Sequence, residues 1–262
     1  MGKYLDRLTV KEFEEFTKQC KTVILPIGIV EQHGYHLPLR TDIDNVEKLL
    51  EKCVERIDAA VAPIVPYCYS GGELKGTINI SPQVFSLYVM DICSELVRNG
   101  FLNIVVLLGH GGTDNRVALE NSLKMFLKKN PGMEDVTLSL IEIFYLSDLW
   151  MKEFTTGPEY DFNAGYVETS LMLYWNPQLV KEDIIMDEPY VARMMRTDQD
   201  WFEVQQKAVD HKFIIPKLKQ RDEIKVGVMG FPEKATREFG EKICNEMIEN
   251  LIKYIDLINR EK

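Results

Sequence analysis

The sequence has no long apolar run: no stretch approaches the about 18 residues that suggest a membrane-spanning helix. The opening residues, MGKYLDRLTVKEFEEF, carry acidic side chains where a secretory signal peptide has its apolar core. Asp6 stands where an N-myristoylation signal has Ser or Thr. We therefore expect no membrane partner and no secretory leader, and we expect the protein to be cytoplasmic.

Cysteine is sparse, and its spacing is irregular. The chain has five cysteines, an odd number, widely scattered and without a CxxC pair. This pattern argues against a disulfide framework and against a zinc knuckle. We expect buried thiols in a reducing compartment.

Positive charge is also in deficit. The chain has 31 Lys and Arg against 41 Asp and Glu, which gives a formal net charge of −10. Nucleic acids require a basic surface, so we expect no nucleic-acid partner. Hydrophobic residues make up 45% of the chain, enough for a sizeable core. No linker rich in Pro, Gly or Ser and no internal repeat divides the sequence, so we predict a single domain over residues 1–262.

Short apolar segments alternate with segments of helical periodicity. Residues 23–27 are an apolar run followed by glycine, and residues 103–112 contain five consecutive apolar residues followed by glycine, which is typical of buried strands. Residues 59–68 and 136–146 predict further strands, whereas residues 147–224 show no regular pattern. The alternation indicates an α/β fold with a mostly parallel sheet covered on both faces, and its active site beyond the carboxyl ends of the strands. The predicted helix N-caps are Thr9, Asp44 or Asn45, and Ser81.

Histidine is rare, yet two of the four histidines follow the first central strand. The segment that contains them holds Glu31, His33, His36, Asp42 and Asp44. If this segment stays extended, Glu31 and His33 leave the same face because they are two residues apart. Nitrogen and oxygen donors of this kind bind divalent metals. The alternative is a set of ordinary polar loop residues, but the density of the cluster favours a metal site.

Two further residues extend this prediction. His110 lies between glycines that allow the backbone to approach a ligand closely, although it could also cap a strand-to-helix turn. Glu168 precedes an apolar helical run and needs a partner, which could be a metal, a salt bridge or a cap. Glu31, His33, Asp42 and His110 together predict ligands for one or two divalent metals, with an aspartate able to bridge two ions.

The segments that carry these residues resemble the motifs of the creatininase (creatinine amidohydrolase) family. LPIGIVEQHGYHLPLRTD is similar to the family's opening LPxGSxEQHGPHLPLxTD, and GHGGTDN to its NGHGGN. KGTINIS, NAGYVETS and GVMGFPEKATREFGE resemble PGTISL, HAGExETS and GVxGDPxxAxxExG. These matches run in order from about residue 22 to residue 242. The resemblance implies a three-layer α/β/α sandwich hydrolase, often assembled as a homohexamer.

The resemblance also implies roles for the ligand set. By motif position, Glu31, Asp42 and His110 would hold one divalent ion, and His33 with the bridging Asp42 would hold a second. Relatives with a glutamate two residues after the His110 position complete the second site with it, but Gly112 stands there, so Glu168 is the candidate replacement. Zn²⁺ and Mn²⁺ are expected, with Fe²⁺ also acceptable to such donors.

Some family positions differ in this chain. Asn163 replaces the histidine of HAGE, Tyr166 replaces its glutamate, and Leu74 replaces a histidine that commonly follows the Glu73 position. Asn163 cannot shuttle a proton, but it can orient a substrate or stabilise an oxyanion. The possible proton donors are His36, Glu73 and Tyr166.

We therefore predict a metal-dependent hydrolase in which a metal-bridged hydroxide attacks the carbonyl of a small cyclic amide or related compound other than creatinine. Two alternatives stay open. One is a hydrolase of carbon–carbon bonds in a cyclic diketone of inositol catabolism, since the family contains such enzymes. The other is a catalytically silent relative that binds a ligand.

Overall fold

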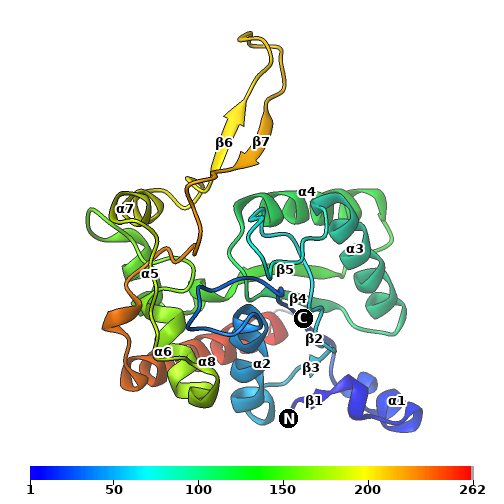
Figure 1. Ribbon diagram of the computed structural model, residues 1–262. Helices are drawn as coiled ribbons and strands as arrows, with labels where there is room; N and C mark the ends of the chain where they lie inside the picture. Colours follow the sequence, from blue (N-terminus) through cyan, green and yellow to red (C-terminus); the bar gives the residue numbers. More distant parts are fainter. Residues whose placement is uncertain (261–262) are drawn as a thin grey trace.

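A computed structural model describes residues 1–260. Its centre is a five-stranded sheet in the order β1-β3-β2-β4-β5, and every neighbouring pair is parallel (Figure 1). The predicted mostly parallel sheet is confirmed. Its strands are β1 (Lys3–Tyr4), β2 (Thr22–Ile27), β3 (Ala60–Val61), β4 (Asn103–Leu108) and β5 (Thr137–Glu142).

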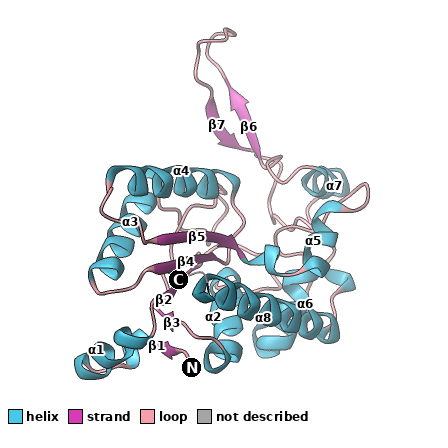
Figure 2. Ribbon diagram, turned by 180° about the vertical axis from the view of Figure 1, so that it is seen from behind, coloured by secondary structure: helices cyan, strands magenta, loops and turns pink. Residues whose placement is uncertain are grey.

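Helices cover both faces of the sheet (Figure 2). Successive side chains of a strand point to opposite faces, and β2 shows this: Val23, Leu25 and Ile27 join one buried apolar cluster, whereas Ile24 joins the other. The first cluster includes side chains of α1 (Val10–Gln19), α3 (Pro82–Arg98) and α4 (Thr113–Lys129). The second includes side chains of α2 (Thr41–Cys53), α5 (Asp148–Thr155), α6 (Tyr166–Trp175) and α8 (Arg237–Arg260). The three-layer α/β/α sandwich is confirmed.

The two central strands bring the candidate ligands together. β2 and β4 are buried at all six positions and pair in register from Thr22 with Asn103 to Ile27 with Leu108. Because both strands end at the same level, the segments that follow Ile27 and Leu108 start side by side. These are the segments that carry Glu31, His33 and His110.

Element boundaries differ from the predictions at three places. α2 begins at Thr41, not after Asp44 or Asn45, because the amide and hydroxyl of Thr41 both donate to the carbonyl oxygen of Pro38. β3 spans only two residues of the segment 59–68, with one further bridge from Val65 to Ile27. β5 ends at Glu142, where the chain tightens into a 3₁₀ helix. The 3₁₀ helices are Leu5–Arg7, Val54–Arg56, Ile143–Leu146, Pro177–Leu179 and Pro232–Lys234.

The segment without a sequence pattern contains α7 (Pro189–Thr197) and an antiparallel hairpin of β6 (Glu203–Gln206) and β7 (Lys217–Gln220). The hairpin projects away from the sandwich (Figures 1 and 2). All five cysteines are buried and free, as expected. Among residues 1–260, no helix has both the length and the apolar character needed to span a membrane.

Candidate metal centre

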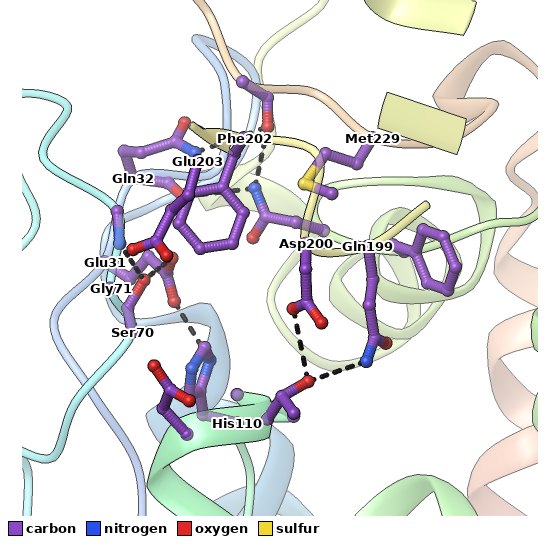
Figure 3. A pocket seen from close by; sticks show the side chains of 18 of the residues that line it. Glu31, Gln32, Ser70, Gly71, His110, Gln199, Asp200, Phe202, Glu203 and Met229 are labelled. Carbon is purple, nitrogen blue, oxygen red and sulfur yellow. Dashed lines mark hydrogen bonds and ion pairs between the residues drawn. The ribbon is translucent and has the colours of Figure 1, made fainter. Parts of the chain in front are cut away.

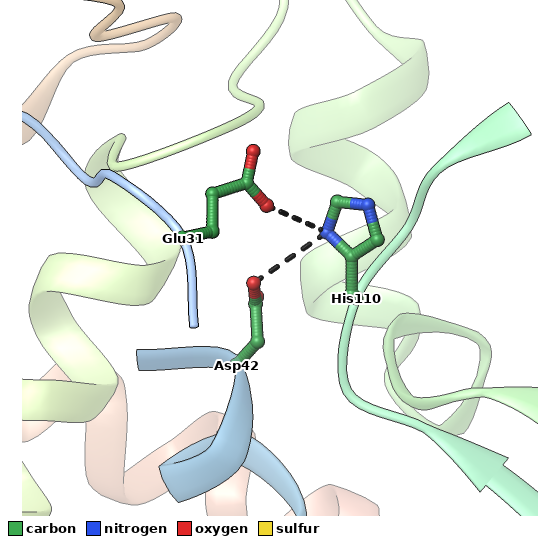
Figure 4. Close-up of side chains that lie close together, drawn as sticks. All are labelled: Glu31, Asp42 and His110. Atoms are coloured by element: carbon green, nitrogen blue, oxygen red, sulfur yellow. Dashed lines mark ion pairs between the residues drawn. The ribbon is translucent and has the colours of Figure 1, made fainter. Parts of the chain in front are cut away.

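Five of the predicted ligands converge at the carboxyl ends of β2 and β4. Glu31, Asp42 and His110 form one group, and His33, Asp42 and Glu168 form another; within each group the candidate ligand atoms lie within 4.8 Å of one another. Figure 4 shows the first group, with Nδ1 of His110 lying 3.0 Å from Oε2 of Glu31 and 3.5 Å from Oδ2 of Asp42. Asp42 is the member that both groups share.

His33 is fixed in an orientation that suits a ligand. Its Nδ1 lies 3.1 Å from the carbonyl oxygen of Glu31, which can only accept a hydrogen bond, so Nδ1 carries the proton. Its Nε2 then faces Asp42 at 3.6 Å and Glu168 at 3.5 Å. A ring nitrogen bonded to a backbone carbonyl while the other faces carboxylates is the arrangement of metal-ligating histidines.

The carboxylates perturb the pKa values of both imidazoles. Burial alone would lower the pKa of His33, but the charges of Asp42 and Glu168 outweigh it and hold that pKa well above its usual value. The pKa of His110 is likewise raised against burial, by Glu31 and Asp42. Burial would raise the pKa of Asp42, but His33 and His110 lower it. The protons on His33 and His110 thus provide the positive charge that a divalent ion would otherwise bring to these carboxylates. A divalent ion that binds these imidazoles must displace those protons.

Glu168 is held by the start of α6 and by α2. Its Oε2 accepts from the amide of Ala164 at 2.7 Å, and its Oε1 accepts from Nδ2 of Asn45 at 3.3 Å. Ala164 has a φ of 56°, a left-handed conformation that is uncommon outside glycine. These contacts direct a helix-borne carboxylate toward His33.

The backbone of Asp42 is wedged between the ends of the two central strands. A Cβ at Gly109 would lie 2.1 Å from the carbonyl oxygen of Asp42, and a Cβ at Gly28 would lie 2.7 Å from Cα of Ile43. Only glycine permits so close an approach. The position of the shared carboxylate therefore depends on two residues without side chains.

The atoms at this centre fit a divalent metal. Three buried atoms that face one another at this centre have no hydrogen-bond partner within the described residues: Oε2 of Glu31, Nε2 of His33 and Oδ2 of Asp42. Unpartnered buried polar atoms are costly, and these belong to the residue types that bind Zn²⁺, Mn²⁺ or Fe²⁺. The donor atoms of each group are therefore of the type that binds a divalent ion.

A cavity of about 350 Å³ opens onto this centre (Figure 3). Glu31, Asp42, His110 and Glu168 lie in its wall, as does Asn163. Five aromatic side chains form much of its apolar wall. Its outer wall consists of Asp114 of α4 and of Asp200, Phe202 and Glu203 from the segment that leads into the hairpin. The aromatic residues are Phe144, Trp150, Phe154, Phe162 and Phe202.

The four predicted catalytic residues are not brought together. Asn163 lines the cavity, and its Nδ2 donates to the carbonyl oxygens of Gly227 at 2.9 Å and Gln32 at 3.4 Å. Glu73 is exposed and lines a neighbouring pocket rather than the cavity.

His36 and Tyr166 point elsewhere. His36 is fully buried, and its Nε2 lies 3.1 Å from the hydroxyl of Thr169; burial, with His33 nearby, lowers its pKa to about 4. The ring of Tyr166 stacks on Phe239 of α8, with centroids 4.3 Å apart. Both side chains make contacts between elements of the fold, His36 with Thr169 of α6 and Tyr166 with Phe239 of α8, and neither lines the cavity. This geometry gives no support to their predicted role as proton donors.

The family model described as creatininase, creatinine amidohydrolase, matches residues 6–255. The chain belongs to the creatininase family. The resemblance seen in its motifs is thereby confirmed, and so is its membership of a family of hydrolases.

Several curated relatives in the creatininase family are similar to this chain. Creatinine amidohydrolase of Pseudomonas putida is 28% identical over 71% of this chain and 76% of its own length. The mycofactocin precursor peptide peptidase of Mycolicibacterium smegmatis is 26% identical over 86% of this chain and 81% of its own. The 3-dehydro-scyllo-inosose hydrolase of Thermotoga maritima is 26% identical over 71% of this chain and 60% of its own.

Solved creatininase structures share the fold. A structure described as a mutant creatininase of Zn-Zn type superimposes with a TM-score of 0.73 at 25% identity, over 98% of this chain and 97% of that chain. Another, a mutant creatininase complexed with creatine, gives a TM-score of 0.75 at 24% identity, over 98% of each chain. Divalent metal binding is thus supported by a zinc-containing relative and by the ligand groups of this chain.

Sequence reasoning missed the residues that hold the ligands of this creatininase fold. Ser70 donates from its hydroxyl to Oε1 of Glu31, and Asn45 donates to Glu168. Neither residue has chemistry that marks it as part of a site. Asn45 could have been found from sequence, because it adjoins the dense cluster of acidic residues and histidines. Ser70 could not, because only the fold brings it close to Glu31.

Proposed function

We propose that this protein is a metal-dependent hydrolase that cleaves an amide-type carbonyl compound, a small cyclic amide or a related molecule. The observation that carries the proposal is the pair of ligand groups that share Asp42 at the wall of one cavity. We assign one ion to Glu31, Asp42 and His110 and the second to His33, Asp42 and Glu168. Zn²⁺ or Mn²⁺ is the proposed metal, and Fe²⁺ suits the same donors.

Divalent ions held there would supply Lewis-acid activation of the carbonyl and of the attacking water. The net reaction adds water to the carbonyl carbon and breaks the C–N bond, which yields a carboxylate and an amine. The chain itself supplies the fixed ligand positions, the aromatic wall that excludes water, and Asn163, which we assign to holding the substrate.

Creatinine is not the proposed substrate. Asn163 occupies the position of the HAGE histidine, and its amide donors are already used by two backbone carbonyls. An asparagine held in this way cannot transfer a proton, so the substrate must be one whose cleavage does not need an imidazole at that position.

The test combines metal analysis with a substrate panel. Protein purified without chelator should contain one to two equivalents of a transition metal. A panel of lactams, formamides and cyclic diketones should contain a compound that the protein hydrolyses. Chelation should remove both the metal and this hydrolysis. Asp42→Asn should lose both properties, whereas Asp91→Asn on the exposed surface of α3 should lose neither.

Other outcomes would contradict the proposal. Protein that takes up neither Zn²⁺ nor Mn²⁺ would point to the silent binding relative. Turnover confined to creatinine would refute the assigned specificity, and turnover confined to the diketones would replace C–N with C–C cleavage.

A further inference from the structure

The outer wall of the cavity carries negative charge without a counter-charge. Asp114, in the first turn of α4, Asp200, in the turn before β6, and Glu203, the first residue of β6, all line it. Figure 3 shows Asp200 and Glu203 around the same cavity as Glu31 and His110. No lysine or arginine is among the lining residues. Within residues 1–260, none of these three carboxylates forms an ion pair.

These carboxylates also repel one another. Burial raises the pKa of Asp200; a hydrogen bond from the hydroxyl of Thr113 opposes this, and the charges of Asp198 and Asp114 add to the increase. Burial raises the pKa of Glu203 too, with added contributions from Asp114 and Asp200. A surface that keeps like charges close together without a cation gains free energy when a cation arrives.

The cavity is a ligand site on independent grounds. Oε2 of Glu31 and Oδ2 of Asp42 lie in its wall without a hydrogen-bond partner and meet only Nδ1 of His110 as an ion pair, and the two residues are only 6% and 2% exposed. The outer carboxylates belong to neither ligand group, so their oxygens remain available to a cationic group of the substrate.

Asn163 adds a neutral group with the same preference. Its Nδ2 donates to the backbone carbonyl oxygens of Gln32 and Gly227, which can only accept hydrogen bonds. This assigns the orientation of the side-chain amide and leaves Oδ1 as the atom that can bind a substrate. An amide oxygen accepts hydrogen bonds from N–H groups. Asn163 is therefore disposed to bind a donor on the substrate rather than an oxyanion, which revises one of its two predicted roles.

The aromatic wall suits a cation as well. The rings of Phe144 and Phe154 have centroids 4.8 Å apart, and those of Phe154 and Phe162 lie 5.4 Å apart. The faces of such rings attract ammonium and guanidinium groups, and they also cover an alkyl chain. Carboxylates, an amide oxygen and ring faces all favour the same kind of ligand.

We propose that the substrate is a positively charged amide, in which an ammonium or guanidinium group binds Asp200 and Glu203 while the carbonyl faces the ligand groups. Asp114 adds to the field without a direct contact. This inference rests on the proposed function for the cleaved carbonyl, but the charge preference is a binding property that exists without turnover.

The test compares ornithine lactam, which carries an ammonium group, with δ-valerolactam, the same ring without it, and with anionic pyroglutamate. Dissociation constants come from ligand-observed NMR titration of the zinc-loaded protein, which does not require hydrolysis. We expect ornithine lactam to bind about tenfold or more tightly than the neutral lactam, and this ratio to fall as salt screens the charges. Asp200→Asn and Glu203→Gln should each lower the ratio about threefold to tenfold.

Asp91→Asn is the matched control, since it removes the same charge from an exposed helix surface that lines none of the pockets described. Equal binding of all three lactams, tighter binding of pyroglutamate, or a ratio that survives both substitutions would overturn the proposal. If the protein takes up no metal, the same titration is made on the metal-free protein; a charge preference that is lost in the two variants would then mean that the proposed hydrolase function fails while the preference of this cavity for cationic ligands stands.

Discussion

A single methyl group at residue 109 should disturb both ligand groups at once. An ideal Cβ at this position lies 2.1 Å from the carbonyl oxygen of Asp42, whereas ordinary van der Waals contact begins at 3.4 Å. The first turn of α2 must therefore move by more than 1 Å in Gly109→Ala, or the end of β4 must move. Overpacking of this kind costs about 1–3 kcal/mol. For a domain of this size, such a loss lowers the melting temperature by roughly 2–6 °C.

The assay is thermal unfolding together with metal analysis of the same samples. Gly109→Ala should melt earlier and should retain less than one equivalent of Zn²⁺ after dialysis, because Asp42 belongs to both groups. Gly132→Ala is the control, since a Cβ there has no atom within 4 Å; it should behave as wild type. A Gly109→Ala protein with the wild-type melting temperature and a full complement of metal would refute the reasoning.

Three further predictions follow from the same geometry. Glu168→Gln should remove one of two zinc equivalents and Asp42→Asn should remove both, measured by plasma mass spectrometry; equal losses would contradict the assignment of Asp42 as the shared ligand. Burial raises the pKa of Glu142 from 4.5 to about 7 and outweighs the opposing charge of Arg116, whose Nε lies 3.1 Å from Oε2; the folded protein thus holds this proton more tightly than the unfolded chain, and wild-type stability falls as the pH rises through that interval. Glu142→Gln should remove this fall and be more stable at pH 8 by about 1–2 kcal/mol in urea titrations of metal-free protein; an unchanged pH slope would refute it. Asp161 accepts from the amides of Tyr166, Val167 and Phe231, and Asp161→Ala should cost about 3 kcal/mol or more in the same assay; a loss below about 1 kcal/mol would show that water replaces the carboxylate.

The buried strands and the ligand set were predictable from sequence because their signals are local. β2 and β4 are apolar after their first residue, and their carboxyl ends place Glu31, His33 and His110 together by a general rule of parallel sheets. The role of Glu168 as a ligand was predicted from the family motif and from the cost of burying an unpaired carboxylate. The homohexamer, which also came only from the resemblance, stays a prediction.

The rest depended on tertiary contacts. Nothing in the local sequence indicates that Tyr166 stacks on Phe239 or that His36 meets Thr169, so both seemed available for catalysis. The hairpin of β6 and β7 was missed because EVQQ and KLKQ bury no apolar face, and hydrophobic periodicity is the main sequence signal for a strand.

The two halves of the cavity come from separate parts of the chain. The ligand side is built on strand ends and helix starts inside the sandwich, whereas Asp200, Phe202 and Glu203 stand at the root of the projecting hairpin. Substitutions, insertions or deletions near that root can change which molecules enter without altering the sheet that positions the ligands. Substrate selectivity and metal-dependent chemistry can thus diversify separately in this architecture. Exchanging residues 199–220 between relatives would be a direct way to transfer the selectivity without changing the ligand residues.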